Sequence, residues 1–271
     1  CTLYFIPLLN PDGCDAFKRR NAQDIDINRD AKRLEAAESK MLMHLRDEIQ
    51  PEFGFNLHDQ DIWYSAGDSK LPATISFLAP SFNEAKDVDD ARIKSMQVIS
   101  SMNEILQNII PNQTAKYYDD FMPTAFGDNV QKKGTSTILI ESGGHHNDPE
   151  KQFVRKLTCL IIMHALHEIA TDSYMKADIN VYDKLPFNKK NTLFDFLIRN
   201  AIISGPNGLY IADIGVRSRL DQDQDRYFVE DIGDLSLHYG YEEIDLNGAE
   251  YPYYSIGDEL DDFLNFNFYE E

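Results

Sequence analysis

The 271-residue sequence lacks several features that would place it in a large class of proteins. It has three cysteines, Cys1, Cys14 and Cys159, and no CxxC pair, so neither a disulfide framework nor a cysteine zinc site is indicated. Basic residues are in the minority, with 26 Lys and Arg against 46 Asp and Glu. The formal net charge of -20 leaves no basic stripe that could neutralise phosphates, so we expect no nucleic-acid partner.

Long apolar runs and repeats are missing as well. A transmembrane helix needs about 20 consecutive apolar residues, and no stretch of the sequence approaches that length. We therefore expect no membrane partner. The compartment stays open, with the cytoplasm slightly favoured.

The sequence begins with an apolar run, residues 2–9, that the turn sequence Asn10-Pro11-Asp12-Gly13 closes. Such a run predicts a buried strand, because strands covered on both faces read as continuous apolar stretches. Since the run follows Cys1 directly, we expect a domain truncated at its N-terminus, with Cys1 on an interior or near-interior strand.

Helical and strand-like segments then alternate. Apolar residues recur at three- and four-residue steps, which predicts helices over 31–49, 86–110 and 149–170. Short apolar runs predict strands at 52–59, 74–80 and 135–142. This alternation indicates an α/β fold with a mixed, mostly parallel sheet flanked by helices, of the phosphorylase/hydrolase-like type.

The pattern changes after residue 171, where short β-like runs such as 194–203, 209–218 and 225–233 lie between Gly, Asn, Pro and Asp. We expect two domains, a catalytic domain over 1–171 and a small β-rich accessory domain over 172–271.

Three groups of residues are candidates for chemistry. They are the Arg- and Asn-rich turn "NPDGCDAFKRRNAQDIDINRD", then His58 after "FGFNL", then Glu141 after "STILI". Ligands in open α/β sheets gather outside the carboxyl ends of the strands. We therefore expect these residues to converge on one cleft.

In this order the motifs resemble those of the zinc carboxypeptidases (funnelins), over about residues 1–170. The resemblance implies that Asn28 and Arg29 hold the free carboxylate of a substrate. A guanidinium fork is suited to this task, because it makes paired charge-assisted hydrogen bonds to a carboxylate. Arg19 matches the arginine that stabilises the developing oxyanion. An anionic ligand would explain why so acidic a chain keeps these cations.

The same resemblance assigns the remaining roles. His58 matches a zinc ligand, which an imidazole nitrogen can be. Glu141 matches the general base that takes a proton from the attacking water and passes it to the leaving amine. The family also has a tyrosine on the loop before this glutamate. Tyr117 and Tyr118 are the candidates, and we assign Tyr118 to substrate binding.

The resemblance departs from the family pattern at the metal. The family supplies two more zinc ligands from a His-x-x-Glu motif upstream of the NPDG strand, and these 271 residues do not include it. The other histidines do not replace it, and we interpret His164 and Glu168 as packing and capping residues of a helix. The histidines other than His58 are His44, His145, His146, His164, His167 and His238. We expect zinc in the intact protein and little activity in this chain alone.

Three functions remain open at this point. The first is a zinc-dependent metallocarboxypeptidase-like hydrolase that cleaves the C-terminal residue from peptides. The second is a non-catalytic module that binds carboxylates. The third is a deacylase of N-acyl amino acids with the same fold.

Overall fold

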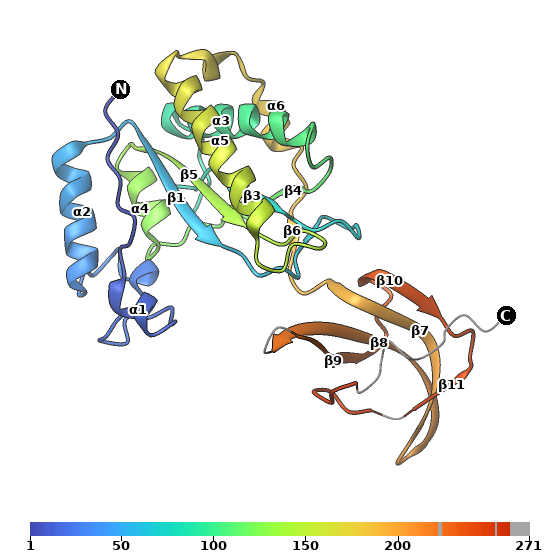
Figure 1. Ribbon diagram of the computed structural model, residues 1–271. Helices are drawn as coiled ribbons and strands as arrows, with labels where there is room; N and C mark the ends of the chain where they lie inside the picture. The colour runs from blue at the N-terminus through green and yellow to red at the C-terminus, as the bar shows by residue number, and fades with distance from the viewer. Residues whose placement is uncertain (222–223, 253, 261–271) are drawn as a thin grey trace.

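The computed structural model describes residues 1–221, 224–252 and 254–260. Its helices and strands form two parts, which are seen side by side in Figure 1. The first is a mixed α/β layer built on a four-stranded sheet. The second is a sheet of five strands that all follow residue 192.

The four-stranded sheet has the order β1 (Phe53–Asp59), β5 (Ser136–Ser142), β3 (Ile75–Leu78) and β4 (Thr114–Lys116). β1 is parallel to β5, β5 is antiparallel to β3, and β3 is parallel to β4. The predicted α/β class with a mixed sheet is therefore confirmed, as are the three strands predicted along it.

Helices lie on both sides of this sheet (Figure 1). α3, α5 and α6 cover one face, and α2 and α4 lie on the other side. The three predicted long helices are present as α2, α3 and α5, and each begins at a later residue than predicted. No helix in the part of the chain that the structure describes is both long and apolar enough to cross a bilayer. The bounds are α1 (Pro11–Asp15), η1 (Ile27–Arg29), α2 (Ala37–Ile49), α3 (Asp90–Gln107), α4 (Phe126–Lys132), α5 (Gln152–Ala170), η2 (Ser173–Lys176) and α6 (Ile179–Asp183).

The late start of α2 has a local cause in the acidic side chain of Asp30. Its two carboxylate oxygens accept hydrogen bonds from the backbone N–H groups of Glu35 and Ala36. These bonds hold residues 30–36 in a turn, so the helical periodicity that begins at Ala31 does not become helix until Ala37.

The two faces of the four-stranded sheet differ in chemistry. Alternate residues of β3 and β5, namely Ile75, Phe77, Ile138 and Ile140, are buried against α3 and α5 in the main core. The residues that alternate with them along the strands, which include Ser76 and Glu141, point to the opposite face. Side chains alternate across a strand, so the same strands carry the core on one face and polar groups on the other.

The second sheet has the order β10 (Tyr239–Asp245), β7 (Leu193–Gly205), β8 (Gly208–Asp221) and β9 (Gln224–Gly233), and β11 (Glu250–Tyr251) also pairs with β7. The β-like runs predicted at 194–203, 209–218 and 225–233 are present as β7, β8 and β9. A core of its own, which includes Ile198, Ile214 and Val229, lies under these strands.

The change between the two parts comes later than the predicted boundary at 172. Tyr174, Tyr182 and Leu185 are buried in the core of the first part. β6 (Asn188–Lys189) pairs with β2 (Ser65–Ala66) of the first part. Residues 172–192 therefore belong structurally to the α/β layer, because their apolar side chains complete its core although their sequence reads as punctuated by turns.

The prediction of a buried strand at 2–9 is wrong, and so is the placement of Cys1 on an interior strand. These residues are not in a strand, and Leu3, Tyr4 and Phe5 are 61%, 63% and 74% exposed. A strand needs a neighbour for its backbone N–H and C=O groups. No described strand pairs with this segment, so its apolar pattern alone does not make it a strand.

Candidate functional site

His58 and Glu141 lie side by side at the ends of two neighbouring parallel strands. His58 of β1 is the direct register partner of Glu141 of β5, and Ser76 of β3 is the partner of Glu141 on its other side. Paired residues of adjacent strands project to the same face. The structure thus brings the predicted imidazole and carboxylate together on the polar face.

The surroundings of this pair favour the neutral forms of both groups. Burial, followed by the positive charges of Arg19 and Arg29, lowers the pKa of His58. Burial, followed by the negative charge of Asp59, raises the pKa of Glu141 to about 7, although Lys151 and Arg19 oppose the shift. A carboxyl group with a pKa near 7 can both accept and return a proton at neutral pH.

The Arg- and Asn-rich turn is folded by its own short polar side chains. The Asn10 carboxamide oxygen accepts from the N–H of Gly13 at the start of α1. Asp26 accepts from the N–H of Asn28 at the start of η1, and its other oxygen accepts from Arg19 Nε at 2.9 Å. Asp26 therefore ties the guanidinium of Arg19 to the Asn28-Arg29 corner.

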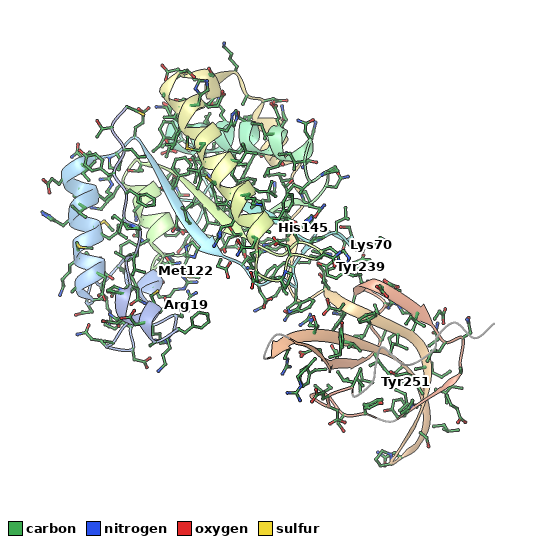
Figure 2. All side chains as sticks on the ribbon, in the orientation of Figure 1. Arg19, Lys70, Met122, His145, Tyr239 and Tyr251 are labelled. Carbon is green, nitrogen blue, oxygen red and sulfur yellow. The ribbon has the colours of Figure 1, made fainter. Side chains whose placement is uncertain are left out.

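The corner in turn is attached to α4. The carboxamide oxygen of Asn28 accepts from the N–H of Phe126, 3.3 Å away, at the N-terminus of that helix. Arg29 is exposed and bonds to the carbonyl oxygen of Asn28 through Nη1. Figure 2 shows Arg19 in the same region as Met122, just before α4. The predicted cations thus lie on the side of the sheet from which His58 and Glu141 project.

Of the two candidate tyrosines, the structure brings Tyr117 rather than Tyr118 to Glu141. Burial and the charge of Glu141 raise the pKa of Tyr117 far above its usual range. Tyr118 is 60% exposed and stacks on Phe187, with ring centroids 4.3 Å apart. The assignment of Tyr118 to the site is therefore wrong in placement, because adjacent residues of an extended chain point to opposite sides.

Two further groups surround Glu141 that the sequence did not single out. Tyr64 hydrogen bonds to Tyr117, and its pKa is raised by burial and the charges of Asp61 and Glu141. The Nζ of Lys151 donates to Asp59 at 2.7 Å and to the carbonyl oxygens of Gln60 and Ser142 at 2.6 and 3.1 Å. Lysine and tyrosine in loops carry no motif, so only the fold identifies them.

A groove of about 340 Å³ opens where β1 and β5 end, and His58 is part of its wall. Leu57, Asp59 and Lys151 line it together with residues of the first turn of α5. The wall is mainly apolar, with the cations Lys151 and Arg155 and the carboxylate of Asp59 among its residues. Leu57 and Asp59 alternate with His58 along β1, so the groove lies on the side of the sheet that α5 covers and not on the polar face that carries Glu141.

The metal requirement of the resemblance is met only in part. A catalytic zinc needs about three protein ligands, and no three His, Cys, Asp or Glu side chains come together among the described residues. His58 is the one zinc ligand that the family motif identifies among the described residues. The described residues do not form a zinc site by themselves.

The other histidines lie in different surroundings. His164 Nε2 is 2.7 Å from the hydroxyl of Ser101, and Glu168 contacts that same hydroxyl at 3.4 Å. A serine nucleophile would instead need the acid on the second nitrogen of the imidazole. This cluster joins α5 to α3, in agreement with the packing role we assign to it from the sequence.

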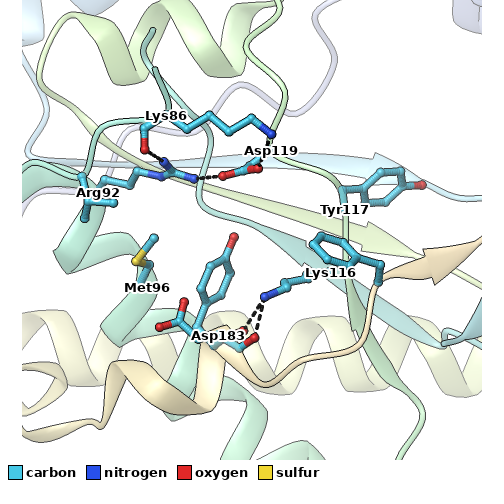
Figure 3. A pocket seen from close by; sticks show the side chains of 10 residues that line it. Lys86, Arg92, Met96, Lys116, Tyr117, Asp119 and Asp183 are labelled. Carbon is cyan, nitrogen blue, oxygen red and sulfur yellow. Dashed lines mark hydrogen bonds and ion pairs between the residues drawn. The ribbon is translucent and has the colours of Figure 1, made fainter. Parts of the chain in front are cut away.

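A second cavity of about 190 Å³ lies near the start of α3 (Figure 3). Arg92, 2% exposed, donates to Asp119 and to the carbonyl oxygens of Ala79, Lys86 and Asp87. Lys116 donates to the carbonyl oxygens of Tyr182 and Asp183 at 3.3 and 2.7 Å. The cations here are used by the protein itself, which indicates a structural network.

The glycines of "ESGG" allow two loops to touch at their backbones. A Cβ atom on Gly143 would lie 2.1 Å from the carbonyl oxygen of Ala73, and one on Gly144 would lie 2.7 Å from that of Ile62. Neither position has room for a side chain. The loop after Glu141 is thus packed on the loop after His58 through Gly144, and on the segment before β3 through Gly143.

Comparisons of this chain with protein-family models, with curated proteins and with solved structures find no match. The resemblance described above therefore depends on the order of the motifs in the sequence.

Proposed function

We propose that this chain has the site of a zinc-dependent hydrolase of the carboxypeptidase type, acting on peptides or N-acyl amino acids that carry a free carboxylate. The observation that carries the proposal is the pairing of His58 with Glu141 on the polar face, with the charge of Arg19 acting on both groups.

Each group has a role that its position supports. Glu141 takes a proton from the attacking water and returns it to the leaving amine. Arg19 stabilises negative charge on the carbonyl oxygen in the transition state. Asn28 and Arg29 bind the substrate carboxylate through the carboxamide N–H groups and the guanidinium fork. When bound, zinc would activate the water, and His58 is the one ligand assigned to it here.

A carboxylate-binding module without catalysis explains this arrangement less well. Such a module would need Asn28 and Arg29, but it has no use for a half-buried carboxylate at the end of β5. A deacylase of N-acyl amino acids would use the same groups as a peptidase. The proposed fold is of the phosphorylase/hydrolase-like type, and we propose that the second sheet is a small accessory β domain.

The carboxylate-binding step can be tested with the 271-residue chain. N-acetylated amino acids and their C-terminal amides are titrated into the protein, and binding is followed by NMR chemical shifts. We expect the acids to bind at least about tenfold more tightly than the amides, because charge-assisted hydrogen bonds contribute about 1.5–3 kcal/mol. Arg29→Met should remove this preference.

Arg20→Met is the matched control. Arg20 lies in the same exposed turn and donates to the carbonyl oxygen of Asp24 at 2.7 Å, and we assign it no contact with the ligand. Equal binding of acids and amides by the unchanged protein would contradict the proposed carboxylate site. Equal loss in both arginine variants would show that only the net charge of the turn matters.

A further inference from the structure

The loops that leave the two site strands both touch the second sheet. We name residues 60–64 after β1 and residues 143–147 after β5 the exit loops. Trp63 lies five residues after His58, and His146 lies five residues after Glu141. Each of these aromatic rings meets a side chain of the second sheet.

The stronger contact is made by Arg217 of β8. Its guanidinium carbon lies 4.7 Å from the ring centroid of Trp63 and 4.7 Å from that of Phe194 on β7. Nε donates to the carbonyl oxygen of Leu193 at 3.0 Å, and Nη2 donates to that of Asn191. A planar guanidinium that stacks on rings and bonds in its own plane is held in one orientation.

The second contact joins the other exit loop to β10. The rings of His146 and Tyr241 have centroids 4.7 Å apart. The segment that connects the two parts makes two further hydrogen bonds to the exit loop after β1. The N–H of Leu193 donates to the carbonyl oxygen of Trp63, and the carboxamide nitrogen of Asn188 donates to the carboxamide oxygen of Gln60. The exit loop after β1 is thus held both by the second sheet and by the segment that leads to it.

The two exit loops are in direct contact with each other, so a displacement of one should be transmitted to the other. A Cβ atom on Gly144 would lie 2.7 Å from the carbonyl oxygen of Ile62, and one on Gly143 would lie 2.8 Å from the carboxamide nitrogen of Gln60. The N–H of Gln60 donates to the carbonyl oxygen of Ser142, and Lys151 bonds to both of these residues. A displacement of Trp63 would therefore reach the ends of β1 and β5.

We propose that the second sheet is a positioning element for the candidate site, and that Arg217, stacked on Trp63, fixes the exit loops and with them the ends of the strands that carry His58 and Glu141. The effect on catalysis rests on the proposed function, whereas the effect on the loops does not. Arg217 is a positioning residue, since it acts through Trp63.

Trp63 is the only tryptophan in the sequence, so tryptophan fluorescence reports on the surroundings of this residue. In Arg217→Gln we expect acrylamide to quench Trp63 more strongly. Backbone amides of both exit loops should exchange with deuterium about tenfold faster, the factor expected when a desolvated cation–π contact is lost. Hydrogen exchange read by mass spectrometry resolves the exit loops from the rest of the chain.

Arg219→Gln is the matched control. Arg219 is on the same strand, pairs with Glu230 and lies 4.5 Å from the ring centroid of Phe228, so its contacts stay within the second sheet. It should leave Trp63 quenching and exit-loop exchange unchanged. Should Arg217→Gln fail to fold, Arg217→Lys keeps the positive charge but loses the planar stack, and it should accelerate exchange in the same loops.

Wild-type exchange rates in both exit loops of the folded Arg217 variant would overturn the inference, as would equal acceleration in Arg219→Gln. In the full-length gene product supplied with zinc, Arg217→Gln should lower kcat more than it changes KM, and Arg219→Gln should change neither. If the unchanged full-length protein hydrolyses no substrate, the proposed function fails, and the exchange measurement still decides the role of Arg217.

Discussion

The two faces of the four-stranded sheet are formed by the same strands, but one face carries the apolar core and the other carries polar side chains. On one face, Ile75, Phe77, Ile138 and Ile140 are buried against helices. On the other face, Ser76 lies beside Glu141, and Glu141 beside His58. Alternation along a strand places adjacent residues in the core and on the polar face in turn. Substitutions on the first face should therefore unfold the protein, whereas those on the second should change chemistry or binding.

The largest loss of stability is expected from Ile75→Ala. Ile75 is fully buried in the main core, and Ile→Ala changes in cores cost about 2–5 kcal/mol through lost burial and the cavity left behind. We expect a decrease of about 4 kcal/mol in the free energy of unfolding, measured by urea denaturation. A loss below about 1 kcal/mol, the range of volume-conserving changes, would show that this face is not the main core.

A smaller loss is expected from Arg92→Met, which removes a cation from the helix-covered side. Its guanidinium bonds to Asp119 and to backbone carbonyl oxygens, and these acceptors would lose their partner. Breaking a buried pair costs about 3–5 kcal/mol, and we expect about 3 because Asp119 is partly exposed. Lys94→Met, at an exposed ion pair with Glu52, is the control and should cost less than about 1 kcal/mol. Equal losses in thermal melts of the two variants would contradict the network.

The Arg92 network also predicts a dependence of stability on pH. Burial by itself would raise the pKa of Asp119, but the hydrogen bonds and charges of Arg92 and Lys86 lower it overall. A folded-state pKa below the unfolded value means that the contribution is present above about pH 4 and is lost as the pH falls through the folded-state pKa. Asp119→Asn should flatten the acid limb of the stability curve. An identical acid limb in both proteins would contradict this account.

The smallest effect should come from Ser76→Ala, the neighbour of Ile75 on the polar face. The Ser76 hydroxyl is buried and has no hydrogen-bond partner among the described residues. Its removal should change the free energy of unfolding by less than about 0.5 kcal/mol, or raise it slightly, because no bond is lost. A loss as large as that of Ile75→Ala would remove the distinction between the two faces.

Much of the fold could be predicted from the sequence, because the apolar pattern decides which residues must be covered. The strands that hold Ile75 and Ile138 and the long helices follow from that pattern. Residues 2–9 show its limit, since the same pattern lies exposed where no neighbouring strand is described. Apolar periodicity predicts which side chains seek cover, but it does not predict which backbone will pair with them.

The candidate site could likewise be predicted from the sequence only in part. His58 and Glu141 follow buried strands, so their meeting at one edge of the sheet could be predicted. The choice of Tyr118 over Tyr117 failed because a shift of one residue reverses the direction of a side chain. Trp63 and Arg217 are far apart in sequence and belong to no motif, so their contact becomes visible only in the folded chain.

The central claim is that Glu141 is the general base of a hydrolase, and one measurement tests it most directly. Glu141→Gln is introduced into the full-length gene product supplied with zinc, and both peptide or N-acyl amino acid hydrolysis and bound zinc are measured. The account predicts a rate at least about 100-fold lower, the usual contribution of a general base, with zinc content unchanged because the base is not a ligand. Hydrolysis at the rate of the unchanged protein would contradict it.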